Sequence, residues 1–427
     1  MFVVNPVVFG DDLTFALGRE VASRKARGES CVDATVGVLM DNDGELAVLP
    51  TVVDVFRETP PAEWAAYAAT TGLDGFCEAV IEDCLFGRPT LREHAVAIAT
   101  PGATGALRTA LRTFLDRNQA FLTTSLTWSA YPIIAQATER RLIRFRMFRD
   151  GHQGFDVEDL DRELDRLMAM QGRALVLLND PCNNPTGYTM SRGDWLAVAE
   201  VLERHSKRGP IAVVLDAVYG AFAPEGLNPA LDALEPLADQ VLLTIAWSAS
   251  KTFTCYGLRA GALVAIAPDR AVRNSVRDTI ACHCCGTWAN CNRGALAALI
   301  RLLQEPRLRA AVACDREVFI DLLAQRSAAF EQAIEEHALC RPTYKGGFFT
   351  SVFVPEAAQV ASVLRDEGVY VVPLEGAVRI ALSAVRSDDL PRLVTALARA
   401  VERGGRRYSG VRSLGPAARP ARRANGR

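Results

Sequence analysis

Lysine is scarce in this sequence, and long apolar runs are absent from it. No stretch reaches the ~18–20 consecutive apolar residues that a membrane span needs, and no charged segment precedes an apolar one at the N-terminus. With a formal net charge of −2 and an aromatic content of 7%, the composition does not imply nucleic acid as a partner of the folded body. We therefore expect a cytoplasmic protein with no membrane partner and no specific nucleic-acid partner.

Disulfides and metal sites are not expected either. The 11 cysteines are an odd number scattered over 427 residues, which is not the pattern of a disulfide framework. The densest cluster joins Cys282, His283, Cys284 and Cys285, with Cys291 beyond. Adjacent cysteines rarely reach one tetrahedral centre together, so we expect no metal there and interpret these thiols as packing or substrate-lining groups.

The middle of the chain alternates short β-rich runs with helical stretches. The runs lie at residues 95–100, 120–125, 142–146, 174–178, 211–215, 241–246 and 261–266. Several are apolar on both faces, as strands buried between two helix layers must be. The alternation predicts an α/β domain with a mostly parallel seven-stranded sheet sandwiched by helices. Ligands of such sheets gather beyond the carboxyl ends of the strands.

The flanking segments predict a second, smaller α+β domain. We assign residues 1–48 to an N-terminal arm and part of the small domain, 49–305 to the large domain and 306–403 to the small C-terminal domain. Residues 290–337 look continuously helical. Residues 404–427 are rich in arginine, contain no acidic residue and are expected to be disordered.

One lysine stands apart from the others. Only four of the 48 Lys and Arg residues are lysines, and Lys25 and Lys207 lie in polar, basic stretches typical of a surface. Lys251 instead lies between two apolar strands, among small hydroxyl residues. A lysine whose amine can shed a proton is what imine formation with a carbonyl requires. The alternative is a lysine that merely caps a strand end.

Two segments offer donors for an anion. After the first strand, Pro101-Gly102-Ala103-Thr104-Gly105 opens a helix with small residues, which lets backbone N–H groups approach an anion while Thr104 adds a hydroxyl. Near the lysine, Ser248, Ser250 and Arg259 could bind the same anion, with Arg259 as a permanently charged, bidentate donor.

Two further polar motifs follow strands. Asn184-Pro-Thr-Gly187 comes after the run at 174–178, although a turn-rich loop would read the same way. Asp216 emerges from a Val-Val-Leu strand, and burying a carboxylate there needs a cationic partner such as a protonated pyridine nitrogen. Tyr219, three residues later, could direct its hydroxyl at a phenolic oxygen.

Together these motifs carry a resemblance. Lys251 with Ser248 and Arg259, Asp216-x-x-Tyr219 and Asn184-Pro-Thr-Gly187 occur in the order and spacing of the fold-type-I enzymes that use pyridoxal 5'-phosphate. The chain most resembles the class I aminotransferases related to aspartate and aromatic aminotransferases. The resemblance implies the fold of that family, pyridoxal phosphate as cofactor, and a homodimer that acts on amino acids and 2-oxo acids at shared active sites.

The resemblance also implies a role for each site residue. Lys251, Asp216 and Tyr219 would be catalytic, with Lys251 as the Schiff-base lysine and proton-transferring base. Asp216 would pair with the pyridine nitrogen. The cofactor would be bound by Ala103, Thr104, Trp128, Asn184, Asp216, Tyr219, Ser248, Ser250, Lys251 and Arg259, and across the dimer by Tyr67. The substrate would be bound by Gly37, Trp128, Asn184 and Arg379, with Arg379 bidentate on its α-carboxylate.

One departure from the family pattern bears on the substrate. Members specific for dicarboxylates carry an arginine, lent by the partner subunit, just before a segment like Thr287-Trp288-Ala289-Asn290. Here residues 282–286 contain no arginine, so we expect an amino donor other than a simple dicarboxylate, with His283 as a possible polar contact.

Two other functions fit the same motifs. A pyridoxal-phosphate-dependent lyase or synthase could carry out elimination, replacement or cyclisation on a specialised amino acid such as S-adenosylmethionine, since all start from the same Cα carbanion. A non-catalytic regulatory protein on this fold would need a DNA-binding domain ahead of it, for which residues 1–30 leave no room.

Overall fold

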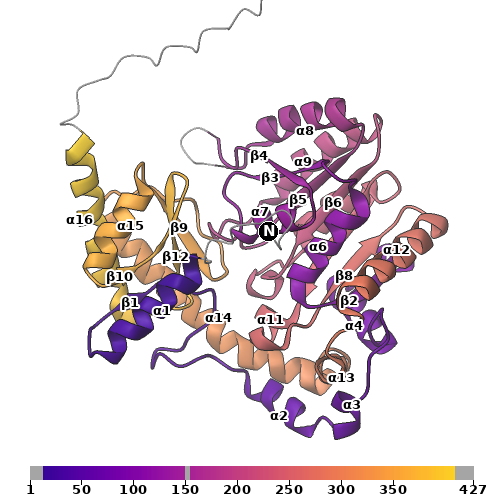
Figure 1. The fold of residues 1–427 in the computed structure, drawn as a ribbon, viewed down its shortest axis with the longest axis horizontal. Coiled ribbons are helices and arrows are strands. Elements are labelled where there is room, and N and C mark those ends of the chain that lie inside the picture. Colours follow the sequence, from indigo (N-terminus) through magenta and orange to yellow (C-terminus); the bar gives the residue numbers. More distant parts are fainter. Residues whose placement is uncertain (1–12, 150–153, 409–427) are drawn as a thin grey trace, which may run out of the picture.

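A seven-stranded sheet forms the centre of the larger of two bodies (Figure 1). The computed structural model describes residues 13–149 and 154–408, with side chains up to residue 403. Strand order is β2-β8-β7-β6-β5-β3-β4. The strands are β2 (Ala95–Thr100), β3 (Ala120–Thr124), β4 (Arg141–Phe145), β5 (Ala174–Leu178), β6 (Ile211–Asp216), β7 (Leu242–Ser248) and β8 (Gly261–Ile266). Only β8 runs antiparallel to its neighbours β2 and β7.

Helices cover both faces of this sheet because its strands are apolar on both sides. In β6, Val213 and Leu215 pack on one face, and Ala212 and Val214 pack on the other. The second face is covered by α6 (Gly102–Phe114), α7 (Ala130–Ala137) and α12 (Arg270–Trp288). The first is covered by α2 (Pro50–Glu58), α4 (Asp74–Cys84), α8 (Val157–Gln171), α9 (Arg192–Ser206), α10 (Asn228–Leu234) and α13 (Arg293–Gln304). The predicted α/β sandwich is therefore confirmed.

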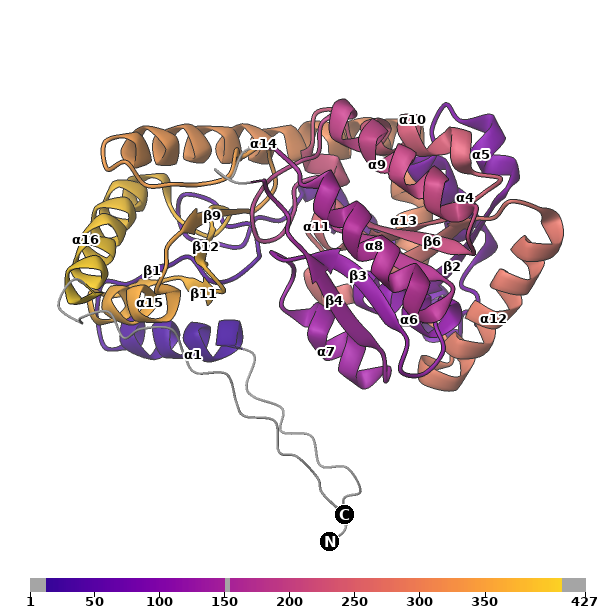
Figure 2. The same cartoon turned by 90° about the horizontal axis from the view of Figure 1, so that it is seen from above.

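A smaller α+β body lies beside the large one (Figure 2). Its sheet is antiparallel, in the order β11 (Val372–Leu374), β12 (Ala377–Ala381) and β9 (Phe349–Phe353). A parallel pair joins β1 (Val32–Asp33) to β10 (Val369–Tyr370). The helices of this body are α1 (Leu13–Ala26), α15 (Ala357–Asp366) and α16 (Leu390–Tyr408). Its apolar core is separate from that of the large sheet.

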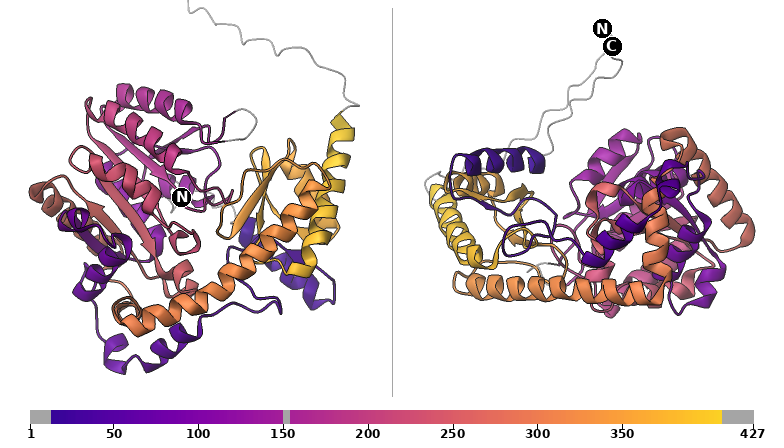
Figure 3. Two further views of the ribbon diagram at one scale, coloured as in Figure 1. Left: turned by 180° about the vertical axis from the view of Figure 1, so that it is seen from behind. Right: turned by 90° about the horizontal axis from the view of Figure 1, so that it is seen from below.

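One long helix joins the two bodies. α14 (Pro306–Glu335) has 30 residues and runs from the large body along the small one (Figure 3). The helix predicted over residues 290–337 is thus two helices, because Pro306 has no N–H with which to continue α13 and instead begins α14. Arg316 of α14 donates to Thr252 O at 3.0 Å in the large body, and Arg326 donates to Ser383 O at 2.9 Å in the small one.

Short elements complete the chain. They are α3 (Pro61–Ala65), α5 (Pro89–Glu93), α11 (Ala249–Thr252) and the 3₁₀ turns Gly220–Phe222, Glu235–Leu237, Tyr256–Leu258 and Ser387–Asp389. Helix α16 continues five residues past Arg403, so the first part of the arginine-rich segment is helical. The expected N-terminal arm (residues 1–12) and residues 409–427 lie outside the described residues, and the domain boundaries at 48, 305 and 403 stay predictions. No described helix is long and apolar enough to cross a membrane.

Candidate active site

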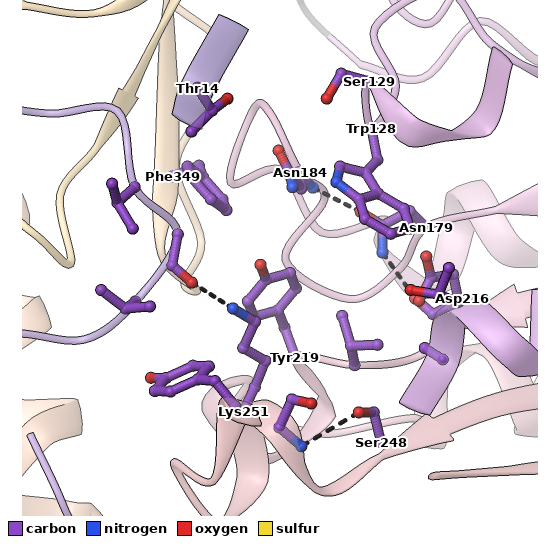
Figure 4. Close-up of a pocket in the computed structure, with 18 of the residues that line it drawn as sticks. Thr14, Trp128, Ser129, Asn179, Asn184, Asp216, Tyr219, Ser248, Lys251 and Phe349 are labelled. Atoms are coloured by element: carbon purple, nitrogen blue, oxygen red, sulfur yellow. Dashed lines mark hydrogen bonds between the residues drawn. The ribbon is translucent and has the colours of Figure 1, made fainter. Parts of the chain in front are cut away.

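A cavity of about 420 Å³ opens at the carboxyl ends of the central strands, between the two bodies. It brings together residues that lie more than 300 positions apart in the sequence (Figure 4). Of the 13 predicted site residues, every one except Tyr67 lines it: Gly37, Ala103, Thr104, Trp128, Asn184, Asp216, Tyr219, Ser248, Ser250, Lys251, Arg259 and Arg379.

Lys251 faces this cavity from α11, directly after β7. The Ser248 side chain accepts from the Ser250 N–H at 3.2 Å and so caps the short helix that carries the lysine. Lys251 Nζ donates to the Gly37 carbonyl oxygen and lies 4.6 Å from the centre of the Tyr256 ring. Burial, reinforced by the positive charges of Arg259 and Arg379, lowers the Lys251 pKa to about 7. The amine is therefore largely neutral just above neutral pH.

Asp216 is the last residue of β6, and one of its two carboxylate oxygens accepts a hydrogen bond. Its Oδ2 accepts a hydrogen bond from Tyr131 OH at 2.6 Å. Its Oδ1 is buried and has no hydrogen-bond partner among the described residues. Burial raises the Asp216 pKa to about 6, although the Tyr131 hydrogen bond lowers it. Because a buried acceptor without a partner is costly, this oxygen fits a cationic N–H supplied by a ligand, as the ring nitrogen of pyridoxal phosphate would be.

Asn179, at the end of β5, holds the neighbouring backbone. Its Nδ2 donates to Asp216 O at 2.8 Å, and its Oδ1 accepts from the Asn184 N–H at 2.6 Å. One amide side chain thereby links the backbones of Asp216 and Asn184.

The other end of the cavity is built for an anion. The N-terminus of α6 presents Ala103 and Thr104 to it. Arg259 directly follows the 3₁₀ turn Tyr256–Leu258 and donates to Ser250 Oγ at 3.2 Å. Gly102 allows this approach, because a Cβ there would lie 2.5 Å from an Arg259 nitrogen. The phosphate of the cofactor fits these donors.

Arg379 enters the cavity from β12 of the small body. It is buried, donates to Thr35 O at 2.7 Å and stacks on the Phe349 ring at 4.6 Å. Its NH1 lies 3.5 Å from Asn184 Oδ1. A Cβ on Gly37 would lie 2.6 Å from the Phe349 ring, so only glycine fits beside it. A guanidinium held flat in this way suits bidentate binding of a carboxylate.

Tyr67 and the cysteine-rich segment lie outside this cavity. Tyr67 is 88% exposed. Cys282, His283 and Cys285 lie on α12, where Cys284 packs into the core beneath α6. Among the described residues no cysteine lines the cavity, and Cys284 packs as one of the two interpretations expected. Among the residues that the structure describes, no group of three or more His, Cys, Asp or Glu is arranged to hold a metal ion.

Sequence reasoning missed several lining or supporting residues. Phe349, Tyr256 and Thr14 line the cavity, and Tyr131 and Asn179 support Asp216. Asn179 could have been found, because it is the first residue after a predicted strand. Tyr131 gave no such signal, since a tyrosine early in a helix is an ordinary core residue.

Known proteins resemble the chain over most of its length. The family described as "Aminotransferase class I and II" matches residues 31–397. An aromatic-amino-acid aminotransferase of Paracoccus denitrificans is 26% identical over 395 residues, which cover 90% of this chain and 96% of that protein. A tyrosine aminotransferase of Rhizobium meliloti (strain 1021) is 27% identical over 370 residues, covering 84% and 90%.

A solved structure gives the same result. An aminotransferase from Anaerococcus prevotii DSM 20548 superposes with a TM-score of 0.89 at 27% identity, covering 94% of this chain and 99% of that one. These similarities confirm the predicted transferase and its cofactor, and they give the lyase alternative no support. With the donor set for pyridoxal phosphate in one cavity, the chain belongs to the class I and II aminotransferases and is a pyridoxal-phosphate-dependent enzyme.

Proposed function

We propose that this aminotransferase moves the α-amino group of an amino acid with an apolar or aromatic side chain to a 2-oxo acid. The observation that carries the proposal is that Lys251, the unpaired oxygen of Asp216 and Arg379 face one cavity. Bound pyridoxal phosphate supplies an electron sink for the negative charge that develops at the substrate Cα.

Each residue of the cavity has its own role in this reaction. Arg379 binds the substrate α-carboxylate and so orients the Cα hydrogen toward Lys251. Lys251 Nζ, neutral above about pH 7, takes the proton from Cα and later returns it. Asp216 holds the cofactor through the ring nitrogen, and Tyr219 and Asn184 hold it at the ring hydroxyl. Trp128 provides a wall for the ring, and Arg259, Ser248, Ser250, Thr104 and Ala103 bind the phosphate.

The choice of side chain follows from the charges in the cavity. Among the described lining residues the cations are Lys251, Arg259 and Arg379, and each has a place in the scheme above. None of them remains within one chain for a distal carboxylate. Phe15, Val36 and Val38 add apolar surface at the cavity. Two relatives bear the names aromatic-amino-acid and tyrosine aminotransferase, which supports the same choice.

We further propose a cytoplasmic homodimer with shared active sites. Tyr67 is almost fully exposed in one chain, as expected of a side chain that completes the phosphate site of a partner subunit. Trp64 nearby is also exposed, at 63%, which gives the same surface an apolar character. Sedimentation of the purified protein would test the dimer, and cell fractionation the location.

A donor screen tests the substrate. Holoenzyme is mixed with phenylalanine, tyrosine, leucine or aspartate and a common 2-oxo acid, and the new 2-oxo acid is quantified by mass spectrometry. We expect the aromatic donors to exceed aspartate in kcat/KM by roughly tenfold or more, because a buried unpaired carboxylate costs more than 1.4 kcal/mol. Aspartate turnover equal to that of phenylalanine would refute the proposed side-chain class, and elimination products without a 2-oxo acid would refute transamination.

A further inference from the structure

Tyr131 contacts Asp216, the one carboxylate among the described residues that line the cavity. It lies in the first turn of α7 and is only 1% exposed, and its OH donates to Asp216 Oδ2 at 2.6 Å. That length is typical of an O–H hydrogen bond to a charged oxygen. Tyr131 also meets Trp128 edge to face, with ring centroids 5.8 Å apart. One buried phenol therefore touches both the acid and an aromatic wall of the cavity.

The direction of this hydrogen bond is fixed by the surroundings. Burial and the negative charge of Asp216 raise the pKa of Tyr131 well above its ordinary value. The phenol thus keeps its proton and acts as the donor, so the negative charge stays on Asp216. Asn179 donates to the backbone oxygen of Asp216 and not to its carboxylate. Oδ1 of the Asp216 carboxylate has no hydrogen-bond partner among the described residues.

The contact also determines how the carboxyl group is turned. The last torsion of an aspartate is broad, so the backbone alone does not decide which oxygen faces the cavity. With Oδ2 bound to Tyr131, Oδ1 is the oxygen left for a ligand. Without the phenol, only the backbone N–H of Val218 would still lower the Asp216 pKa, no side-chain donor among the described residues would remain, and the carboxyl group would more readily take up a proton of its own.

We propose that Tyr131 is a positioning residue that keeps Asp216 charged and turned toward the ring nitrogen of the cofactor, and so sets how strongly that nitrogen is held. The proposal rests on the assignment of Asp216 to the ring nitrogen. Tyr131 touches neither substrate nor cofactor in this scheme, and it acts through Asp216.

Cofactor binding by the apoenzyme tests this role without measuring turnover. The dissociation constants of pyridoxal phosphate and of its 1-deaza analogue, which has carbon in place of the ring nitrogen, are measured at neutral pH. Wild-type apoenzyme should prefer pyridoxal phosphate. Tyr131→Phe should bind pyridoxal phosphate about tenfold or more weakly, because a hydrogen bond to a charged group is lost, and should bind the analogue as wild type does. The preference for the natural cofactor should therefore shrink by that factor.

The chain offers a matched control. Tyr188 OH donates to Asp194 Oδ2 at 2.9 Å, which is the same kind of pair outside the cavity. Tyr188→Phe should leave both dissociation constants unchanged, and urea unfolding of each apoenzyme shows the loss of stability common to the two changes. Tyr131→Met, which also lacks a donor, replaces the phenylalanine variant if the latter is insoluble.

The possible outcomes distinguish the role of Tyr131 from the assignment of Asp216 to the ring nitrogen. If Tyr131→Phe keeps the wild-type preference, or weakens both cofactors equally, the positioning role is wrong while the assignment of Asp216 stands. If wild-type apoenzyme shows no preference between the two cofactors, the assignment of Asp216 to the ring nitrogen is wrong, and the role of Tyr131 falls with it.

Discussion

In the proposed function, proton transfer depends on a neutral amine at Lys251, and this neutrality can be measured directly. Its pKa of about 7 lies about 3.5 units below the ordinary value of 10.5. At pH 7.5 about three quarters of such amines are neutral, against about one in a thousand for an ordinary lysine. Protonating Lys251 in the folded apoenzyme thus costs about 5 kcal/mol more than in the unfolded chain.

Trace labelling with acetic anhydride reports this fraction, because only the neutral amine reacts. Apoenzyme is labelled between pH 5.5 and 10.5, and the modified peptides are quantified by mass spectrometry, with exposed Lys207 as the reference amine. We expect half-maximal labelling of Lys251 near pH 7. Arg259→Met should move this midpoint upward, since the Arg259 charge helps to lower the Lys251 pKa. A midpoint above pH 9.5 in wild type would refute the reasoning.

Four further predictions follow from the same geometry. Lys251→Met should make the apoenzyme more stable than wild type at pH 7, because the folded state of wild type must hold a lysine whose pKa is lowered from 10.5 to about 7. The difference in the free energy of unfolding should decrease as the pH rises from 7 and vanish above 10.5, as urea unfolding at several pH values would show. Arg379→Lys keeps the positive charge but loses the two parallel N–H donors that bind a carboxylate bidentately. KM for both the amino acid and the 2-oxo acid should therefore rise roughly 10–100-fold in steady-state assays, and an unchanged KM would contradict the proposed role of Arg379. Gly187→Ala should lower the free energy of unfolding by about 1–3 kcal/mol in thermal denaturation, because Gly187 has φ +68° and a Cβ would overlap the Phe349 carbonyl oxygen. Tyr67→Phe should weaken cofactor binding about tenfold by equilibrium dialysis, and no change would count against a shared site.

Most of the fold could be predicted from the sequence. Each strand of the large sheet was predicted within two residues at either end, because buried strands between helix layers leave short, uniformly apolar runs. The small body was harder to predict: in the largely apolar segment 32–40, only Val32 and Asp33 form a strand, by pairing with β10. Such pairing depends on residues 369–370, which no local pattern can reveal.

The site was predictable wherever a residue type was costly in its local setting. An aspartate after Val-Val-Leu and a lysine between two strands each required an explanation. Tyr131 and Phe349 required none, because aromatic residues belong in cores, and their importance arises only from what the fold places beside them. The contact proposed for Tyr67 would need a second chain, and its neighbours in the sequence carry no signal for such a contact.

The continuity of α14 has a mechanical consequence. Arg316 binds the carbonyl next to Lys251, and Arg326 binds a carbonyl two residues beyond the end of the strand that carries Arg379. Ten residues of one helix, a span of about 15 Å, therefore separate the contact beside Lys251 from the contact beyond the strand of Arg379. Because one continuous helix holds both contacts, a change in the distance between the backbones of Lys251 and Arg379 would be expected to bend α14 or to break one of these two hydrogen bonds.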